Sequence, residues 1–442
     1  MKSLLIRGAE AVTPDGVRQL DVLIENGSIS RIGNLSSFSA GEKLDADGLV
    51  LMPGVIDPQV HFREPGNTHK EDLESGSRAA AAGGVTAFLD MPNTNPPATT
   101  AQAIREKIEL AKTKCHVDFG FFVGATPNNV DELNAAHEAC GIKIFMGSST
   151  GTLLVNERRD LDRIFASGRK LIAVHAEDEE TIRANKAAFG DSATLMDHPH
   201  IRSPEAALKA TRLAVELSKK YGRRLHILHM TTEEEVRLLE KEKTPGVISA
   251  EVCPQHFLLE YPKDYERLGT YAQMNPPIRE ARHGRALWQA LKDGVIDCTA
   301  TDHAPHTREE KGRNYPHAPA GMPGVETLLP VMLNRVNQGL CTLSDLARWM
   351  CAGPARLYGM VGKGKIEVGY DADLVLIDMK KERTVRNGEL QTKVNWSPYD
   401  GWTLKGVPVM TLVRGEFAHR EGKFREPGWG RPIRYDAPWE KT

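Results

Sequence analysis

Short apolar runs alternate with amphipathic stretches through the middle of the chain. Eight runs predict buried strands, at residues 55–61, 85–90, 117–124, 142–146, 171–175, 225–229, 247–253 and 295–301. Helical patterns separate several of them, for example at residues 100–114, 204–221 and 279–292. Eight strands alternating with helices predict a closed (β/α)8 barrel of the TIM type. A doubly wound open sheet is the alternative, although no glycine-rich phosphate loop follows the first strand.

The two ends of the chain have a different pattern, made of short β runs broken by glycine and Asn-Gly turns. The predicted strands lie at residues 4–8, 21–27, 28–33, 373–378 and 409–415. Neither end has enough apolar surface for a core of its own, so we expect both to build one small β-sandwich domain. The predicted limits are 1–53 and 363–442 for this domain and 54–362 for the inserted barrel.

The composition is that of a globular protein, with 40% hydrophobic and 26% charged residues and a formal net charge of −2. This balance gives no reason to expect nucleic acid or an acidic membrane as a partner. The six cysteines include no CxxC pair. No signal peptide or apolar run of roughly 18 residues is evident, so we expect no membrane span. The sequence predicts a cytoplasmic protein with reduced thiols.

Polar side chains collect at or near the ends of the predicted strands, where a parallel α/β protein places its chemistry. They are His61, Asn93, Lys143, His175, His229, Asn275 and Asp302, with Gln59 and His306 close by. Because barrel strands end at one mouth, residues far apart in sequence can meet there. Imidazole and carboxylate groups suit Zn²⁺ and similar ions, and a pair of such ions can activate water. The pattern therefore predicts a metal site.

Each of these residues has a simpler interpretation when it is taken alone. A strand-end histidine, a strand lysine in a salt bridge or an aspartate in a turn needs no ligand. His226 and His229 are three residues apart, so alternation points them to opposite faces of a strand. Only one is then expected to point inward, and His229 is nearer the mouth. A free ammonium on Lys143 would repel metal ions, whereas a carbamate formed with CO2 would offer two anionic oxygens.

Four segments make the chain resemble the dihydroorotases of the amidohydrolase superfamily. They are HFREPG at 61–66, MPNT at 91–94, MNPP at 274–277 and TDHAPH at 301–306. The similarity covers nearly the full length, to GYDADL at 369–374, which is widespread in the superfamily and says little about the substrate. The resemblance implies reversible hydrolysis of (S)-dihydroorotate to N-carbamoyl-L-aspartate, a step of pyrimidine biosynthesis.

The resemblance also implies a role for each matching residue. His61, His175, His229 and Asp302 match metal ligands for one or two Zn²⁺ per subunit, and Lys143 matches a carboxylated bridging lysine. Asp302 would be the general base and acid. The substrate would be held by Arg63, Asn93, Asn275, His306 and the backbone near Ala320 and Gly321. Arg63 could grip the carboxylate of dihydroorotate with two hydrogen bonds.

Related cyclic amide hydrolases remain alternatives. Allantoinases usually carry asparagine where Arg63 stands, and hydantoinases lack the Phe-Arg-Glu-Pro run. The segment GMPGVE at 321–326 resembles hydantoinases as much as dihydroorotases.

Gln59 departs from the usual His-x-His pair. It could coordinate weakly, give way to water, or leave one of the two metals poorly bound. A rival class is therefore a non-catalytic scaffold that partners aspartate carbamoyltransferase. The presence of Arg63 and Asp302 argues against it, because a scaffold needs neither a carboxylate clamp nor a base. Residues 307–319 could form a lid or a solvated loop. A homodimer is a family-level expectation.

Overall fold

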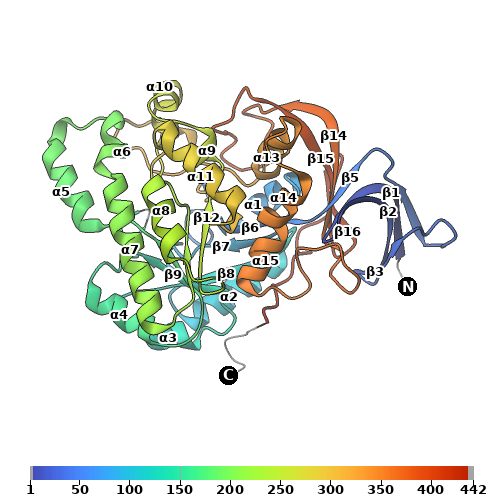
Figure 1. Cartoon of the computed structure of the whole chain (residues 1–442), viewed down its shortest axis with the longest axis horizontal. Coiled ribbons are helices and arrows are strands. Elements are labelled where there is room, and N and C mark those ends of the chain that lie inside the picture. Colours follow the sequence, from blue (N-terminus) through green and yellow to red (C-terminus); the bar gives the residue numbers. More distant parts are fainter. Residues whose placement is uncertain (1–2, 150, 437–442) are drawn as a thin grey trace.

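The computed structural model describes residues 3–149 and 151–436, and its largest part is a barrel of eight parallel strands (Figure 1). The strands stand in sequence order, and a bridge between Val60 and His303 joins the first side of the barrel to the last. They are β6 (Val55–Val60), β7 (Val85–Asp90), β8 (Asp118–Gly124), β9 (Gly141–Phe145), β10 (Ile172–His175), β11 (Leu225–Ile227), β12 (Ile248–Val252) and β13 (Cys298–Thr299). Each overlaps a predicted run, and the predicted barrel is confirmed.

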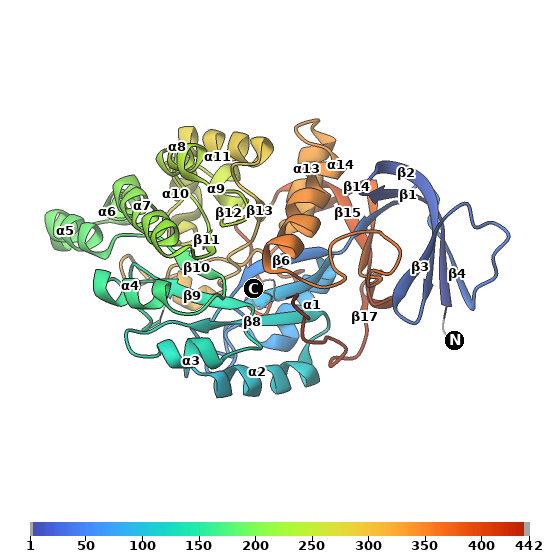
Figure 2. The same ribbon diagram turned by 60° about the horizontal axis from the view of Figure 1, so that its bottom comes forward.

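Helices surround the barrel strands (Figure 2). They are α1 (Leu73–Ala82), α2 (Ala101–Lys114), α3 (Val130–Ala135), α4 (Arg158–Ala166), α5 (Glu179–Phe189), α6 (His198–Ile201), α7 (Pro204–Tyr221), α8 (Glu233–Glu242), α9 (Gln255–Leu258), α10 (Lys263–Leu268), α11 (Ala281–Asp293), α12 (Arg308–Lys311), α13 (Leu328–Asn337), α14 (Leu343–Ala347) and α15 (Gly353–Tyr358). Local chemistry sets their ends. The Ser203 side chain accepts a hydrogen bond from Ala206 N–H at the start of α7, and left-handed Gly222 ends it.

Strand alternation divides the barrel into an outer and an inner core. In β8, Phe119 and Phe121 belong to the apolar cluster beneath the helices, whereas Phe122 belongs to a separate cluster inside the barrel. Tyr358 from α15 joins that inner cluster, and Tyr435 packs against it. These two aromatic side chains fill the end of the barrel opposite the strand ends that carry the polar residues.

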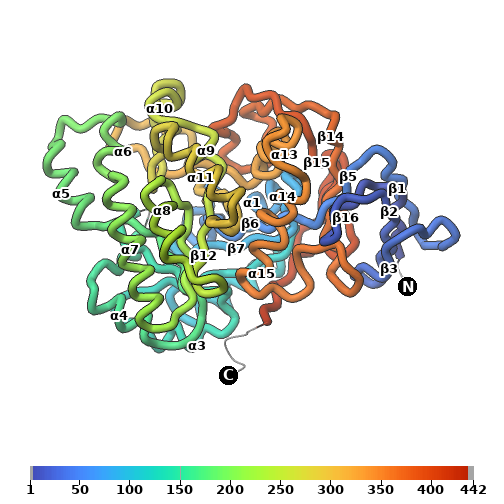
Figure 3. The backbone as a smooth tube through the Cα atoms, in the orientation of Figure 1, coloured from blue at the N-terminus to red at the C-terminus, as the bar shows by residue number. Residues whose placement is uncertain are grey.

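Both ends of the chain contribute to one small β domain, as predicted, and the N-terminal and C-terminal segments lie side by side in it (Figure 3). Its strands form one nine-stranded mixed sheet. Its strands are β1 (Ser3–Thr13), β2 (Gly16–Glu25), β3 (Ser28–Gly33), β4 (Glu42–Asp45), β5 (Val50–Pro53), β14 (Leu374–Thr384), β15 (Thr403–Val413), β16 (Glu416–Arg420) and β17 (Lys423–Phe424). Leu4 and Ile24 pack with Leu374 and Leu412 in a single apolar cluster. The N-terminal and C-terminal strands therefore share a core that neither could build alone.

The last described residues leave this sheet and lie along the barrel. Phe119 N–H donates to Arg431 O at 3.0 Å, and Ile433 N–H donates to Phe119 O at 2.9 Å. The chain end thus tethers the small sheet to the barrel. No helix among residues 3–149 and 151–436 combines the length and the apolar character that a membrane crossing requires.

Candidate metal and substrate site at the barrel mouth

A pocket at the ends of the barrel strands gathers the residues that the sequence singled out, apart from His306. Its lining consists of Gln59, His61, Arg63, Asn93, Lys143, Phe145, Ser149, His175, His229, Asn275, Asp302, Ala304, Ala320 and Gly321. The free space between these side chains is about 20 Å³, the room of roughly one water molecule.

One side of the pocket joins the end of β6 to the segment after β13. His61 Nε2 lies 3.0 Å from Asp302 Oδ1, and Gln59 Nε2 donates to the same oxygen at 3.1 Å. The other imidazole nitrogen, His61 Nδ1, lies 2.7 Å from Asn93 Oδ1. Because an amide oxygen only accepts, this contact places the proton on Nδ1 and turns the Nε2 lone pair toward Asp302.

The opposite side of the pocket joins the ends of β10 and β11. His175 Nδ1 lies 3.1 Å from His229 Nε2. His175 Nε2 lies 2.9 Å from Glu177 Oε2, which also accepts a hydrogen bond from Arg202 Nε at 3.0 Å. The Glu177 carboxylate thus holds the proton on His175 Nε2 and leaves Nδ1 as an acceptor that faces His229.

These contacts fit a divalent ion. At His61 and Asp302 two acceptors face each other, an arrangement that a cation between them would stabilise. Two further buried atoms at the pocket, Gln59 Oε1 and His229 Nδ1, have no hydrogen-bond partner among the described residues. Nitrogen and carboxylate donors are the set that Zn²⁺ accepts in hydrolytic sites. His61, His175, His229 and Asp302 are the residues that could hold such an ion, and Gln59 Oε1 is in place to assist.

Two charged side chains at the pocket have shifted pKa values. Burial lowers the pKa of Lys143 to about 7, against the opposing charges of Asp302 and Glu251. Burial alone would raise the pKa of Asp302, but at low pH the hydrogen bond and charge of protonated His61, with the charge of His229, hold it at about 2. Burial lowers the pKa of His61 itself, so near pH 7 that proton has left and the Nε2 lone pair faces the carboxylate. The lysine is therefore partly neutral near pH 7, and the aspartate is ionised.

The backbone is strained at three positions of the pocket. Arg63, His229 and Asp302 have positive φ values of 63°, 36° and 48°, which non-glycine residues seldom adopt. Such strain persists only where surrounding contacts hold it, and it concentrates at functional sites. The position of His229 also explains a wrong expectation. His226 points into the barrel from β11, whereas His229 follows the end of that strand and lines the pocket with a positive φ. Strand alternation therefore does not relate the two residues.

Arg63 and His306 form a third group beside the candidate metal ligands. Arg63 Nε donates to Pro305 O at 3.2 Å, and Arg63 Nη2 lies 3.2 Å from His306 Nε2. His306 Nε2 also lies 3.1 Å from Ala320 O, and His306 Nδ1 lies 3.0 Å from Lys70 Nζ. Burial, with the charge of Arg63, lowers the pKa of His306 well below its usual value. Lys70 donates to Nδ1, so the neutral ring carries its proton on Nε2 and gives it to Ala320 O. His306 thus lies behind Arg63, outside the pocket lining, and is held by Lys70 and Ala320.

The remaining predicted residues lie at the rim. Asn275 Oδ1 lies 3.1 Å from His198 Nε2, which also lies 3.0 Å from Met274 O. Residues 307–319 contain α12, and buried Lys311 ties that segment down. Lys311 Nζ donates to Gln273 O at 2.9 Å and to Pro319 O at 2.8 Å. Buried Lys311 thus anchors a segment that the sequence alone presents as a surface loop.

Sequence reasoning missed several functional neighbours. Phe145 and Ser149 line the pocket after β9, and only their position beyond a strand end could have indicated them. Glu177 lies two residues after His175, a spacing that is compatible with a carboxylate behind a ligand but is too common to be diagnostic. Lys70 has no sequence signal, because its contact with His306 spans 236 residues.

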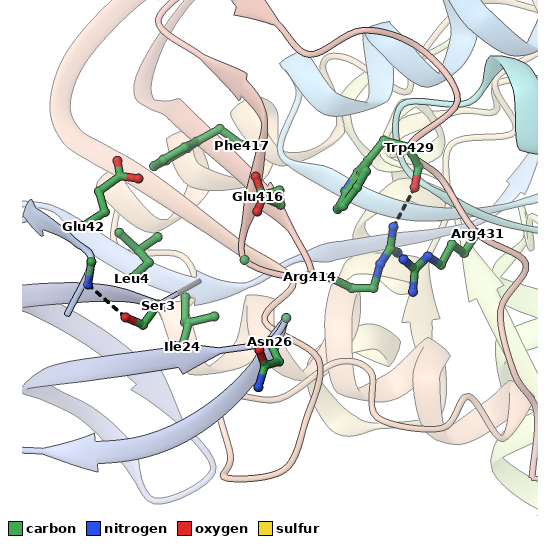
Figure 4. Close-up of a pocket in the computed structure, with 13 residues that line it drawn as sticks. Ser3, Leu4, Ile24, Asn26, Glu42, Arg414, Glu416, Phe417, Trp429 and Arg431 are labelled. Atoms are coloured by element: carbon green, nitrogen blue, oxygen red, sulfur yellow. Dashed lines mark hydrogen bonds between the residues drawn. The ribbon is translucent and has the colours of Figure 1, made fainter. Parts of the chain in front are cut away.

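A roomier hollow of about 490 Å³ lies between the N-terminal strands and the C-terminal segment (Figure 4). Trp429 and the guanidinium groups of Arg414 and Arg431 border one side of it, and Leu4 and Phe417 border the other. The hollow contains no histidine or cysteine. Arg414 is engaged with Asp118 and with Trp429 O. These contacts of Arg414 tie the sheet to the barrel.

Comparison with known proteins places the chain. The sequence profile of the Amidohydrolase family matches residues 50–418. The chain belongs to the amidohydrolase family. The dihydroorotase of Methanosarcina mazei is 37% identical over 98% of this chain and 97% of its own length. The allantoinase of Streptomyces avermitilis is 36% identical over 96% and 97%.

Solved structures agree with this assignment. L-Hydantoinase (dihydropyrimidinase) from Arthrobacter aurescens is similar with a TM-score of 0.92 and 32% identity, covering 98% of this chain and 100% of that chain. Amidohydrolase relatives with three different substrate names thus resemble the chain over nearly its whole length. The family confirms the predicted fold and enzyme class, and the residues of the pocket must distinguish among substrates.

Proposed function

We propose that this chain is a metal-dependent cyclic amide hydrolase with dihydroorotase activity, which interconverts (S)-dihydroorotate and N-carbamoyl-L-aspartate. Arg63 carries the choice of substrate. Its side chain lines the pocket and is only 3% exposed, yet no carboxylate of the described residues lies within ion-pair distance. The carboxylates of Asp302 and Asp90 act on Arg63 only from beyond ion-pair distance. A buried cation without a direct ion-pair partner is costly, and the carboxylate of dihydroorotate would supply one. Allantoin and hydantoin carry no carboxylate.

The side chains suit the proton transfers of ring opening. Asp302 is ionised, so it can take a proton from the attacking water and deliver it to the ring nitrogen that leaves. His61 and Gln59 fix the orientation of its carboxylate. Arg63 would orient the ring through two charge-assisted hydrogen bonds. In the reverse direction the same groups close carbamoyl aspartate to the ring, because one barrier separates the two states.

The amidohydrolase family is metal-dependent. We propose that this chain binds one or two Zn²⁺ ions through His61, His175, His229 and Asp302. When bound, such ions polarise the scissile carbonyl and make a nearby water more acidic. Lys143 is proposed to carry a carbamate. The lowered pKa of its amine supports this, because only the neutral amine reacts with CO2. The role of Gln59 is that of a weak neutral ligand or of a hydrogen-bond donor to Asp302.

Two other functions have specific support. The allantoinase and hydantoinase relatives favour a related cyclic amide substrate, and Gln59 favours a non-catalytic scaffold. Arg63 argues against the first alternative, since neutral rings leave its charge unmet. Ionised Asp302 and the facing lone pairs argue against the second, because a scaffold has no use for them.

Substitution of Arg63 tests the choice of substrate. Arg63→Ala should raise KM for dihydroorotate on the order of 100-fold, because a bidentate charged contact contributes about 2–3 kcal/mol. Metal content should stay normal. Turnover of hydantoin, if measurable, should not fall, since that ring has no carboxylate. Arg237→Ala on the outer face of α8 serves as the matched control. An unchanged KM for dihydroorotate would remove Arg63 from its proposed role.

The proposal has further parts that follow from the activity. We propose a homodimer, possible association with aspartate carbamoyltransferase, and a cytoplasmic location that suits six free cysteines. Residues 54–362 are the proposed limits of the catalytic barrel, with 1–53 and 363–442 as the accompanying β domain.

A further inference from the structure

A second group of potential metal ligands lies inside the barrel, away from the pocket lining. His226 of β11, Glu251 of β12 and Cys298 of β13 each offer one ligand atom, and these atoms lie within 4.8 Å of one another. The three strands are neighbours in the barrel, and all three residues are 0% exposed. The His226 ring contacts Tyr358, which fills the barrel end opposite the pocket. The group therefore sits in the lower layer of the barrel.

Glu251 is the member of this group whose bonding is incomplete. Its Oε2 lies 3.0 Å from His226 Nε2, while its Oε1 is buried without a hydrogen-bond partner among the described residues. Within the described chain, no lysine or arginine nitrogen lies at ion-pair distance from this carboxylate. Burying a carboxylate costs free energy when its one partner is an imidazole, which can lose its charge. The unpartnered oxygen is part of the same close group as the His226 nitrogen and the Cys298 sulfur.

Another acidic group shows how the chain satisfies buried carboxylates without a metal. Asp118, Asp371 and Asp373 also offer ligand atoms within 4.8 Å of one another. Lys363 Nζ lies 2.6, 2.9 and 2.5 Å from their oxygens in that order, so an ammonium already occupies the centre. Among the described residues no ammonium or guanidinium lies at ion-pair distance from Glu251, and Lys143 interacts with it only through its charge from farther away. The two groups thus differ in the feature that decides whether a metal ion is needed.

We propose that His226, Glu251 and Cys298 bind a divalent ion of the Zn²⁺ type, at a site separate from the one at the barrel mouth. The site does not depend on the proposed substrate. Ligand atoms around tetrahedral zinc lie about 3.3–3.8 Å apart, as bond lengths of about 2.0–2.3 Å require. The group therefore needs to contract by only about 1 Å. His226 Nδ1 lies 2.9 Å from Ser249 Oγ, a contact that directs Nε2 toward Glu251 as in second-sphere histidine support.

The lower end of the barrel offers an approach to this site. A cleft of about 590 Å³ is lined by Ser249, together with Arg224, Lys243 and Leu357. Ser249 is half-buried and contacts His226 directly. An ion entering from this cleft is thus one side chain away from the site. Binding converts the Cys298 thiol to a thiolate, and the released proton leaves through the same cleft.

The ion would join three adjacent strands in a part of the barrel where strand pairing is short. β12 and β13 share only two paired positions, Glu251 with Cys298 and Val252 with Thr299. A metal ion bound by both Cys298 and Glu251 would reinforce the pairing of these two strands. We therefore expect the site to stabilise the fold and to leave kcat and KM nearly unchanged.

Cobalt substitution tests the site, because the residues lining the mouth pocket include no cysteine. Purified protein loaded with Co²⁺ should show thiolate-to-cobalt charge-transfer absorption in the near ultraviolet. Cys298→Ala should abolish that absorption and lower the bound cobalt by about one ion per chain, as removal of one three-ligand site requires. Cys140→Ala is the matched control, because Cys140 is also buried in the inner cluster but belongs to no such group.

The outcomes are decisive in both directions. Absent charge transfer in the unsubstituted protein, or charge transfer that survives Cys298→Ala, overturns the proposal. If Cys298→Ala does not fold, X-ray absorption on the unsubstituted zinc protein gives an independent answer. It should contain a sulfur scatterer at about 2.3 Å, whereas a shell of nitrogen and oxygen alone overturns the site.

Discussion

The barrel mouth and the junction between barrel and sheet both bury charged residues, but they satisfy them differently. At the junction, Lys363 contacts three carboxylates, and Asp118 also accepts from Arg414. At the mouth, acceptor faces acceptor between His61 and Asp302. Buried charges that are partnered within the chain stabilise the fold, whereas those left incomplete mark where a ligand is expected.

Lys363 at the junction and Lys143 at the mouth show the same contrast between a partnered and an unpartnered buried charge. Against burial, which would lower it, the charges of Asp373 and Asp118 raise the pKa of Lys363 above its usual value. Burial lowers the pKa of Lys143 to about 7, and among the described residues no carboxylate lies at ion-pair distance from it. One lysine is thus locked as a cation, and the other is available as a neutral amine.

The largest effect should come from the mouth. Asp302→Asn should lower kcat by about 10³- to 10⁴-fold, because the variant cannot accept the proton from water. The free energy of unfolding of the metal-free protein should change little, since the carboxylate faces a lone pair there. Steady-state kinetics and urea denaturation measure the two quantities. Substantial activity in the variant would mean that another group moves the proton.

A substitution at the junction should lower the stability of the fold and leave the activity nearly unchanged. Lys363→Met should cost about 3–5 kcal/mol of unfolding free energy, because it strands buried carboxylates. Activity per folded molecule should persist. Lys143→Met is the matched comparison and should not destabilise the metal-free protein, since no ion pair is lost. Equal destabilisation by both substitutions, measured by urea denaturation, would erase the distinction between the two regions.

Glu326 is an intermediate case, with one oxygen hydrogen-bonded and the other, Oε1, only in a long ion pair of 3.8 Å with Arg383 Nη2. Its Oε2 accepts from Gln391 N–H at 2.6 Å, and burial raises its pKa to about 7. The folded state therefore keeps a proton that the unfolded state releases, so stability falls as pH rises from about 4.5 to 7. Glu326→Gln should remove up to about 3 kcal/mol of that fall. Unfolding free energies at pH 5 and pH 8 should differ less in the variant, and an identical pH dependence would contradict the assignment.

The smallest effect should come from the support of one metal ligand. Glu177→Gln should weaken metal affinity by about 10- to 100-fold, the usual result of losing a carboxylate behind a ligating histidine. The carboxylate holds the proton on His175 Nε2 and presents Nδ1 to the site. Competition with a chelator measures the change. Glu180→Gln, on an exposed residue of α5, is the control, and equal affinities in both variants would remove Glu177 from this role.

Much of the barrel could be predicted from the sequence because its strands have local patterns. β7 and α7 have the predicted limits, since apolar runs and a Ser-Pro start define them. β13 is reduced to Cys298–Thr299. Thr301 N–H donates to Asp57 Oδ1 at 3.1 Å, across 244 residues, in place of a strand carbonyl. No local pattern could indicate that shortening.

In the candidate site, too, local patterns indicate some residues and long-range contacts determine the others. Residues that end strands could be predicted together, because barrel geometry brings strand ends to one mouth. The contacts that orient them come from elsewhere in the chain. Asn93 reaches His61 across 32 residues, and Arg202 reaches Glu177 across 25. The second group of ligands escaped prediction because His226 was expected to face away from the interior when His229 faced toward it.

Substrate turnover tests the central claim most directly. Zinc-loaded protein, with its metal content measured, should be assayed in parallel with dihydroorotate, allantoin and hydantoin, and in reverse with carbamoyl aspartate. The account predicts turnover of dihydroorotate in both directions and a far lower kcat/KM for the two neutral rings. Faster turnover of a neutral ring, or none of any substrate with the metal fully bound, would contradict it.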